Sequence, residues 1–339
     1  MMFLKWSLNI LVYITAITMA TFTNENAKIK CHSVPNYRNS LNNNCIMPIH
    51  YNLDMIMLPG KLLSGELNVT FYINCEISNI TLHTTRSLLI VMFRSPNGTI
   101  YIPNSDYSEN FATFNFIKYL SPENTHIDCG VYTMYVKYEI IFVHRHYGMY
   151  YIKREDRRDK EFLFATLLQP RNARQLFPCW DDPKLKATFN ITVKFDTGYN
   201  AKSNTIPIKV EVLYNRMIRL LFHMTPKISV NDVTIIMFDL QSDYISKINN
   251  ISFWSKWDLI PYMKWAQYVA GNVSMYLENN WRIISRSEPK MDYVVFPIDL
   301  TEYKKRNCGV ILFRKKWYRT FRLSFLRGIS PYKYWVPIK

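Results

Sequence analysis

The sequence has 339 residues, of which 48% are hydrophobic, 15% aromatic and 20% charged. These proportions are those of a globular protein and exclude a disordered, collagenous or coiled-coil chain. The formal net charge is strongly basic, at +16, and the presence of only 9 glycines argues against an enzyme that holds phosphate in a glycine-rich loop. At roughly 150 residues per domain, this length predicts two domains.

The N-terminus has the pattern of a secretory signal peptide over residues 1–20. Lys5 precedes an uncharged stretch with an apolar centre at residues 10–20, and small residues near Ala20 suit a cleavage site. A signal-anchored membrane protein is the alternative, but polar residues interrupt a segment that needs ~20 mostly apolar residues to span a bilayer. We therefore expect a secreted or extracellular protein that starts near Thr21, with residues 21–44 as a linker.

Glycosylation and disulfide bonding fit the same compartment. Six Asn-X-Ser/Thr sequons without proline at the middle position predict N-glycans at Asn68, Asn79, Asn97, Asn190, Asn250 and Asn272. The six cysteines are too few for a disulfide scaffold of this length, but some are expected to pair in an oxidising compartment. Their connectivity cannot be derived from their spacing.

Short apolar runs rich in Val, Ile, Thr, Phe and Tyr follow one another through the first two thirds of the chain. Each run is bounded by Asn, Ser, Pro or Gly, which is typical of β-strands. So many strands without a helix predict a saddle-like β-sandwich domain over residues 45–245. The predicted strands are residues 67–73, 88–93, 111–117, 131–143, 162–168, 189–195, 209–213, 218–222 and 233–240.

The apolar period changes after Pro261. Apolar residues recur there at spacings of three and four between Tyr262 and Leu277, which predicts an amphipathic helix. Residues 292–298 and 309–313 then read as two further strands. We expect a second, incomplete α+β domain over residues 246–339.

The densest motif is the block 166–189, which reads T-L-L-Q-P-R-N-A-R-Q-L-F-P-C-W-D-D-P-K-L-K-A-T-F. It resembles the corresponding block of the aminopeptidase N family of zinc metallopeptidases. The matching positions are Thr166, Gln169, Ala173, Arg174, Phe177, Pro178, Cys179, Asp181, Pro183, Lys186, Ala187 and Phe189. Further blocks at 48–53, 80–83, 147–150, 203–207, 225–229 and 289–292 follow in the family's order.

This resemblance covers residues 45 to about 315 and implies a β-rich N-terminal domain, followed by the start of a thermolysin-like catalytic domain. In this family a catalytic zinc is held by H-E-x-x-H on one helix and a Glu on the next. The sequence has seven histidines, and no two stand four apart with Glu after the first. We therefore expect no metal, no cofactor and no catalytic residue in this truncated sequence.

A second signature of the family, Gly-x-Met-Glu-Asn, supplies a Glu that binds the free α-amino group of the substrate. Counting forward from Pro297 with one inserted residue, Arg306 stands where that Glu is expected, and Asn307 is retained. A guanidinium repels an ammonium group. The resemblance thus implies a degenerate amine site at Arg306 and loss of aminopeptidase specificity.

Gln169 matches a family residue whose amide helps to receive the substrate amine, whereas Leu167 replaces the usual Gln two positions earlier. Gln169 and Asn307 are therefore vestigial substrate-binding candidates. For Gln169, the alternative is a polar side chain that simply ends a strand. His144 and His146 could share an ion on one strand face, but no third ligand is visible, and surface histidines are the alternative.

The charge is concentrated at the C-terminus. Residues 303–339 contain 11 Lys or Arg and no Asp or Glu, interleaved with aromatic residues. This pattern suits an anionic glycan or membrane surface, whereas nucleic acid is not expected for a secreted glycoprotein. The alternative is a frayed end that lacks its acidic partners.

Three functions remain open. The chain could be a secreted, catalytically inactive aminopeptidase N-like protein that acts as a binding or decoy module, with peptides or an extracellular protein as partners. It could instead be a fragment of a working zinc aminopeptidase that removes N-terminal residues from peptides. The basic tail could also bind an anionic surface, which is compatible with the first function.

Overall fold

The computed structural model describes residues 45–314, except for 59–61, 75–76, 86–87, 117–118, 120–126, 128, 142–147, 156–159, 240–241, 249–250, 257–289, 297–304 and 308. The chain divides into two compact units, and the division falls between Asp239 and Leu240. The first, β-rich unit therefore ends close to the domain boundary that the sequence predicts at residue 245.

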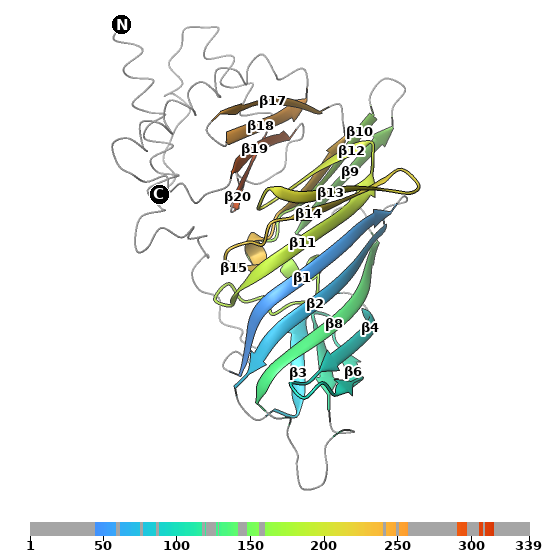
Figure 1. The fold of residues 1–339 in the computed structure, drawn as a ribbon, viewed down its shortest axis with the longest axis vertical. Helices are drawn as coiled ribbons and strands as arrows, with labels where there is room; N and C mark the ends of the chain where they lie inside the picture. The colour runs from blue at the N-terminus through green and yellow to red at the C-terminus, as the bar shows by residue number, and fades with distance from the viewer. Residues whose placement is uncertain are drawn as a thin grey trace, which may run out of the picture. The chain divides into compact units, whose positions relative to one another are not determined.

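A large twisted sheet forms the centre of the β-rich unit, and its long strands lie side by side in Figure 1. Parallel pairing occurs between β1 and β11, and the other neighbours pair antiparallel. In spatial order the strands are β13 (Pro207–Leu213), β14 (Met217–Phe222), β11 (Lys186–Asp196), β1 (Ile46–Leu58), β2 (Leu62–Ile73), β8 (Gly130–Ile141), β4 (Leu88–Arg94) and β5 (Ile100–Tyr101), and β15 (Ile228–Ser229) also pairs with β11.

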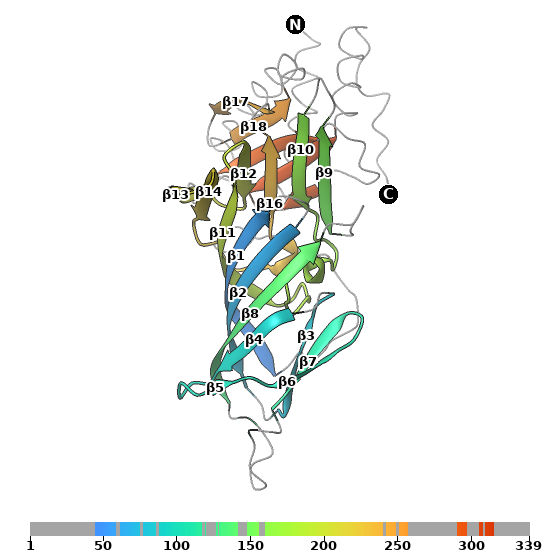
Figure 2. The same cartoon turned by 90° about the vertical axis from the view of Figure 1, so that its right-hand side faces the viewer.

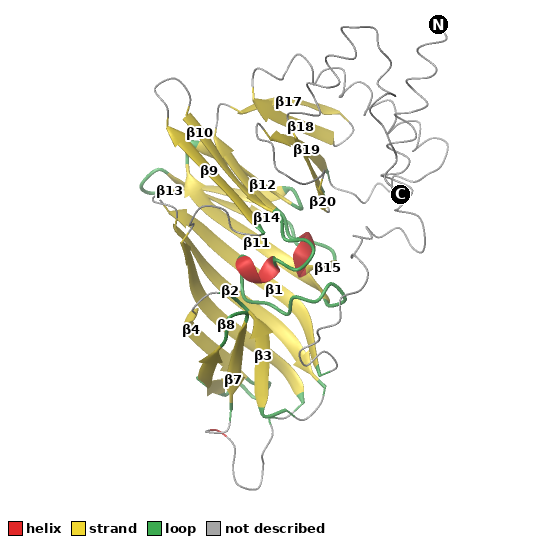
Figure 3. Cartoon of the chain, turned by 180° about the vertical axis from the view of Figure 1, so that it is seen from behind, coloured by secondary structure: helices red, strands yellow, loops and turns green. Residues whose placement is uncertain are grey.

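Two smaller sheets complete this unit, and Figure 2 shows both. One has the order β12 (Tyr199–Ser203), β16 (Ile235–Asp239), β10 (Lys160–Thr166) and β9 (Met149–Glu155). The other has the order β3 (Asn79–His83), β7 (Phe111–Asn115) and β6 (Asn104–Tyr107). Two short 3-10 turns, η2 (Ala173–Gln175) and η3 (Val230–Asp232), lie in front of the large sheet in the view of Figure 3.

Strict alternation along the strands creates the core, because successive side chains of a strand point to opposite faces. On β8, every second residue from Tyr132 to Ile140 is buried, while the residues between them lie nearer to solvent. Tyr51 stacks on Phe189 with ring centroids 4.8 Å apart. Gly65 lies opposite Tyr138, and a Cβ atom at residue 65 would stand 2.2 Å from Tyr138 Cζ. Only glycine therefore lets this ring lie against the neighbouring strand.

The second unit contains a five-stranded sheet within its described part. Its order is β17 (Ser242–Ile248), β18 (Ile251–Lys256), β19 (Met291–Phe296), β21 (Val310–Arg314) and β20 (Lys305–Asn307). Both neighbours of β19 are parallel to it, whereas β17 and β20 pair antiparallel at the two edges. The helix predicted after Pro261 lies outside the described residues.

The predicted fold class is confirmed, since the chain is mainly β and its first unit is a layered sheet structure. The predicted strands of this unit correspond to β2, β4, β7, β8, β10, β11, β13, β14 and β16. The sequence did not predict β1, β9 or β12 as strands. β1 carries Pro48, His50, Asn52 and Asp54, which resemble turn residues, but these residues occupy the polar face or the bulge between Pro48 and His50.

Candidate functional site

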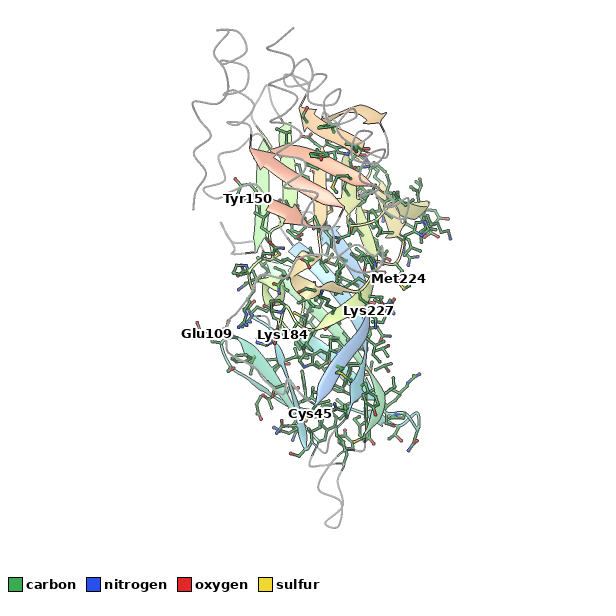
Figure 4. All side chains as sticks on the ribbon, turned by 90° about the vertical axis from the view of Figure 1, so that its left-hand side faces the viewer. Cys45, Glu109, Tyr150, Lys184, Met224 and Lys227 are labelled. Carbon is green, nitrogen blue, oxygen red and sulfur yellow. The ribbon has the colours of Figure 1, made fainter. Side chains whose placement is uncertain are left out.

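The signature block 166–189 forms the connection between β10 and β11 and lies largely within the core. It passes through η2 and a following loop to β11, and Lys184 in Figure 4 marks the exposed end of this loop. From η2 to the start of β11, the apolar residues Ala173, Leu176, Phe177, Cys179 and Trp180 are at most 2% exposed. The motif that carries the family resemblance therefore has a structural role in this unit.

A buried ion pair anchors the block. Arg174 Nε, on η2, donates to Asp181 Oδ2 at 2.8 Å, and Asn231 Nδ2 donates to the other carboxylate oxygen at 2.9 Å. Asp181 is 1% exposed, so its charge depends on these two partners. Arg174, Asp181 and Asn231 therefore connect η2, the loop before β11 and η3.

His83 fastens the same loop to β3. Its backbone exchanges hydrogen bonds of 2.9 and 3.0 Å with that of Cys179, and its Nδ1 accepts from Asp181 N–H at 3.2 Å. Burial, together with the charges of Arg174 and Arg171, lowers the pKa of His83 to about 3. The ring is therefore neutral at physiological pH, with the proton on Nε2.

Gln169 belongs to a polar network at the end of β10. Its Nε2 donates to Asp232 Oδ1 at 2.9 Å, and Asn204 Nδ2 donates to the Asp232 backbone carbonyl at 2.9 Å. Thr166 Oγ1 accepts from Ile235 N–H at 2.9 Å in the same region. Gln169 thus connects the segment that follows β10 to η3. Its proposed vestigial role in substrate binding stays a prediction.

The second signature lies in the other unit, on β20. Lys305, Arg306 and Asn307 pair with Leu312, Ile311 and Val310 of β21. Gly309, in the turn, has a φ of 73°, which favours glycine. Arg306 and Asn307 therefore lie on the edge strand of the five-stranded sheet, while Gln169 belongs to the β-rich unit.

A second buried ion pair lies beside this sheet. Lys290 Nζ contacts Asp292 Oδ2 at 2.5 Å, and Trp254 Nε1 donates to Asp292 Oδ1 at 3.0 Å. Burial lowers the pKa of Lys290, and Asp292 opposes that shift. The contact links the start of β19 to β18.

Several predicted features cannot be placed. His144, His146, Asn250, Asn272 and almost all of the basic tail lie outside the described residues. The sequons at Asn68 and Asn97 are exposed, and those at Asn79 and Asn190 are partly exposed. Cys129 and Cys179 are free thiols, so the predicted disulfide pairing concerns the other four cysteines and stays a prediction.

Sequence reasoning missed the roles of His83, Asn231 and Asp232. His83 was part of a recognised block, but nothing local indicated its contact with a loop almost 100 residues further along the chain. The pair Asn231–Asp232 follows directly after the block 225–229, which was the available signal. Within the described part, no helix is long and apolar enough to span a membrane.

Comparison with known proteins identifies the class to which this fold belongs. Residues 47–230 match the peptidase M1 N-terminal domain, and the chain belongs to the peptidase M1 family. The matched range includes the signature block and most of the large sheet.

Individual relatives agree with this assignment. Aminopeptidase Q of Mus musculus is 34% identical over 175 residues, or 49% of this chain and 31% of the relative. Aminopeptidase Q of Homo sapiens is 26% identical over 298 residues, or 79% of this chain and 29% of the relative. Endoplasmic reticulum aminopeptidase 1 of Rattus norvegicus is 29% identical over 278 residues, covering 80% of this chain and 29% of the relative. The chain thus spans less than a third of the length of each of these relatives.

The residues present do not fit the zinc ion that the family resemblance implies. The sequence contains no H-E-x-x-H. In the described ranges, His, Cys, Asp and Glu do not form a group of three or more that could hold a metal ion. His83, the most buried described histidine, instead supports the backbone of the signature loop.

Proposed function

We propose that this chain is a secreted, catalytically inactive relative of aminopeptidase N that acts as a binding or decoy module. The observation that carries the proposal is the identity of residue 306. The hairpin of β20 and β21, with its turn at Gly309, supports the register in which Arg306 replaces the Glu of Gly-x-Met-Glu-Asn. In that register a cation stands where the family binds the ammonium group of its substrate.

The missing zinc ligands also support an inactive protein. A catalytic zinc site needs three protein ligands and an open position for water. The H-E-x-x-H pair that supplies two of them is missing from this sequence. In this family the zinc ion would polarise the peptide carbonyl and activate water.

We therefore propose that the β-rich unit binds a partner instead of catalysing peptide hydrolysis. Its core is continuous, and its signature loop is fixed by the Arg174–Asp181 pair and by His83, so the fold does not depend on a metal. Peptides or an extracellular protein are the proposed partners. The basic residues of 303–339 are a second proposed contact, with an anionic glycan or membrane surface.

One observation favours a second candidate function. The chain covers 31% and 29% of the two aminopeptidase Q proteins, so a longer product could contain the zinc-binding segment. In that case the present sequence would be part of a zinc aminopeptidase that removes N-terminal residues from peptides. The cation at Arg306 counts against this candidate.

The transcript beyond codon 339 separates the two candidates, because an in-frame H-E-x-x-H would support the enzyme and a stop codon would support the inactive module. Metal analysis and N-terminal sequencing of the purified, secreted chain test the inactive module itself. The inactive module should contain no stoichiometric zinc after dialysis against zinc-containing buffer, and N-terminal sequencing should give a start near Thr21. One zinc ion per chain would contradict the inactive module, and recovery of a cytosolic protein that keeps Met1 would contradict secretion.

A further inference from the structure

The edge strand β13 combines an exposed apolar face with a charged face. Ile208, Val210 and Val212 are 54%, 59% and 78% exposed. Among the described strands, β13 pairs only with β14, so the large sheet ends there. Exposed apolar edge strands are templates for pairing with another strand.

The apolar face of β13 continues the inner face of the large sheet. Val210 lies opposite Leu220 of β14, which in turn lies opposite the buried Val193 of β11. Val212 lies opposite Ile218 in the same way. The apolar layer therefore reaches β13, where its side chains remain in contact with solvent.

The opposite face carries a ladder of ion pairs that also ends at β13. Asp54 of β1 contacts Lys194 of β11 at 3.0 Å and Arg219 of β14 at 3.9 Å. Arg219 contacts Glu211 of β13 at 3.1 Å, and Glu211 contacts Lys209 at 2.5 Å. Lys209 has a 65% exposed side chain, so the ladder ends in a cation at the sheet edge.

We propose that two copies of this chain form a two-fold dimer by antiparallel pairing of their β13 strands about Val210. The sequence of β13 is self-complementary in this register. Lys209 of each copy then lies opposite Glu211 of the other, and Ile208 lies opposite Val212. Both the charge ladder and the apolar face continue across the two-fold axis, as an isologous interface requires.

Other registers lack this complementarity. A slip of two residues in one direction places Glu211 opposite Glu211, and a slip in the other direction places Lys209 opposite Lys209. A slip of one residue brings charged and apolar side chains to the same face. Charge pairing therefore selects the register centred on Val210.

Charge reversal tests the register. Lys209→Glu and Glu211→Lys should each weaken self-association on the order of tenfold, because like charges then face each other across the axis. An equimolar mixture of the two variants should associate again, since each reversed charge meets its opposite in the mixed dimer. Analytical ultracentrifugation of the full chain measures both effects.

A matched pair of substitutions tests the strand itself. Val210→Lys places two lysines on the axis and should give a monomer, whereas Val131→Lys, at an exposed valine of β8, should leave the dimer intact. Thermal unfolding of each variant shows whether it is folded, and hydrogen exchange of the β13 amides should increase only in Val210→Lys. A wild-type monomer, protected β13 amides in a monomer, or a mixture of charge variants that stays monomeric would each overturn the proposal.

Discussion

At the scale of single residues, the signature block stabilises the fold through charges that are removed from water. Asp181 receives hydrogen bonds from Arg174 and Asn231, and Asp181 N–H donates to His83. These side chains come from η2, the loop before β11, η3 and β3, so each contributes to fixing the others. The block 166–189, which resembles the zinc peptidases most closely, is therefore also the hydrogen-bonded connection between β10 and β11 in this fold.

Substitution of Asp181 by Ala should destabilise the β-rich unit by about 3 kcal/mol, at the lower end of the cost of breaking a buried ion pair, because the Arg174 side chain is 15% exposed while the Asn231 amide also loses its acceptor. Glu66→Ala is the matched control, since Glu66 forms an exposed pair with Lys137 at 3.8 Å. That change should cost about 0–1 kcal/mol. Denaturant unfolding measures both free energies, and equal losses would show that the buried pair has no special role.

His83 should make stability depend on pH. Its pKa is about 3 in the folded protein and 6.5 ordinarily, so the unfolded chain binds more protons between these values. The free energy of unfolding should therefore fall as the pH falls through this window, by up to about 1.4 kcal/mol per pH unit from this group.

The variant His83→Asn keeps an acceptor for Asp181 N–H and should show a correspondingly weaker pH dependence. His223→Asn, at an exposed histidine, should retain the wild-type slope. Denaturant titrations between pH 4 and 7 compare the slopes, and identical slopes in His83→Asn and the wild type would contradict a neutral, buried His83.

Arg306 is the residue on which the proposed loss of activity depends. If the chain is extended with the zinc-bearing segment of a relative, activity should stay low, because like charges ~4 Å apart cost about 4 kcal/mol at an effective dielectric near 20. Arg306→Glu should then recover part of a roughly thousandfold loss, only for substrates with a free α-amine. Lys305→Glu is the control for the alignment register. A fully active chimera that retains Arg306 would show that another residue receives the amine.

At the scale of secondary structure, alternation predicted the strands whose two faces differ sharply. β8 and β2 were predicted because apolar residues recur at every second position between polar ones. β1 was missed because proline, histidine, asparagine and aspartate interrupt its pattern, although Pro48 is buried next to a bulge and His50, Asn52 and Asp54 lie on the more exposed face. Short strands such as β12 contain too few apolar residues for a pattern to be recognised.

The candidate site was less predictable than the strands. The alignment could place Gln169 and Arg306 in motifs, but the Gln169–Asp232 contact spans 63 positions and the Asn231–Asp181 contact spans 50. The spacing of apolar residues along the chain does not show which residues so far apart in the sequence come into contact. The location of Arg306 on an edge strand also depends on sheet order, which the sequence does not determine.

N-glycosylation also depends on secondary structure, because the exposure of each sequon is set by the strand or turn that contains it. Asn97 lies in the exposed turn between β4 and β5, where an enzyme can reach it, and should be modified. Asn97→Gln should remove one glycan without loss of stability, as seen by mobility before and after glycosidase treatment. Asn104→Gln, outside any sequon, is the control, and unchanged mobility of Asn97→Gln would show that this turn is not modified.

At the scale of the whole molecule, the chain joins a β-rich unit that matches the peptidase M1 N-terminal domain to a second unit with a five-stranded sheet. In the proposed alignment, the second unit carries Arg306 where the family binds its substrate. The leader predicted at residues 1–20 and the exposed sequons at Asn68 and Asn97 fit the proposed role outside the cell.

The most direct test is an assay of the purified, secreted chain with chromogenic aminoacyl substrates in zinc-containing buffer. A full-length active relative at equal concentration serves as the positive control. The account predicts no release of the amino-terminal residue above the background without protein. Release that is abolished by a chelator would contradict it and show that the chain is a working zinc aminopeptidase.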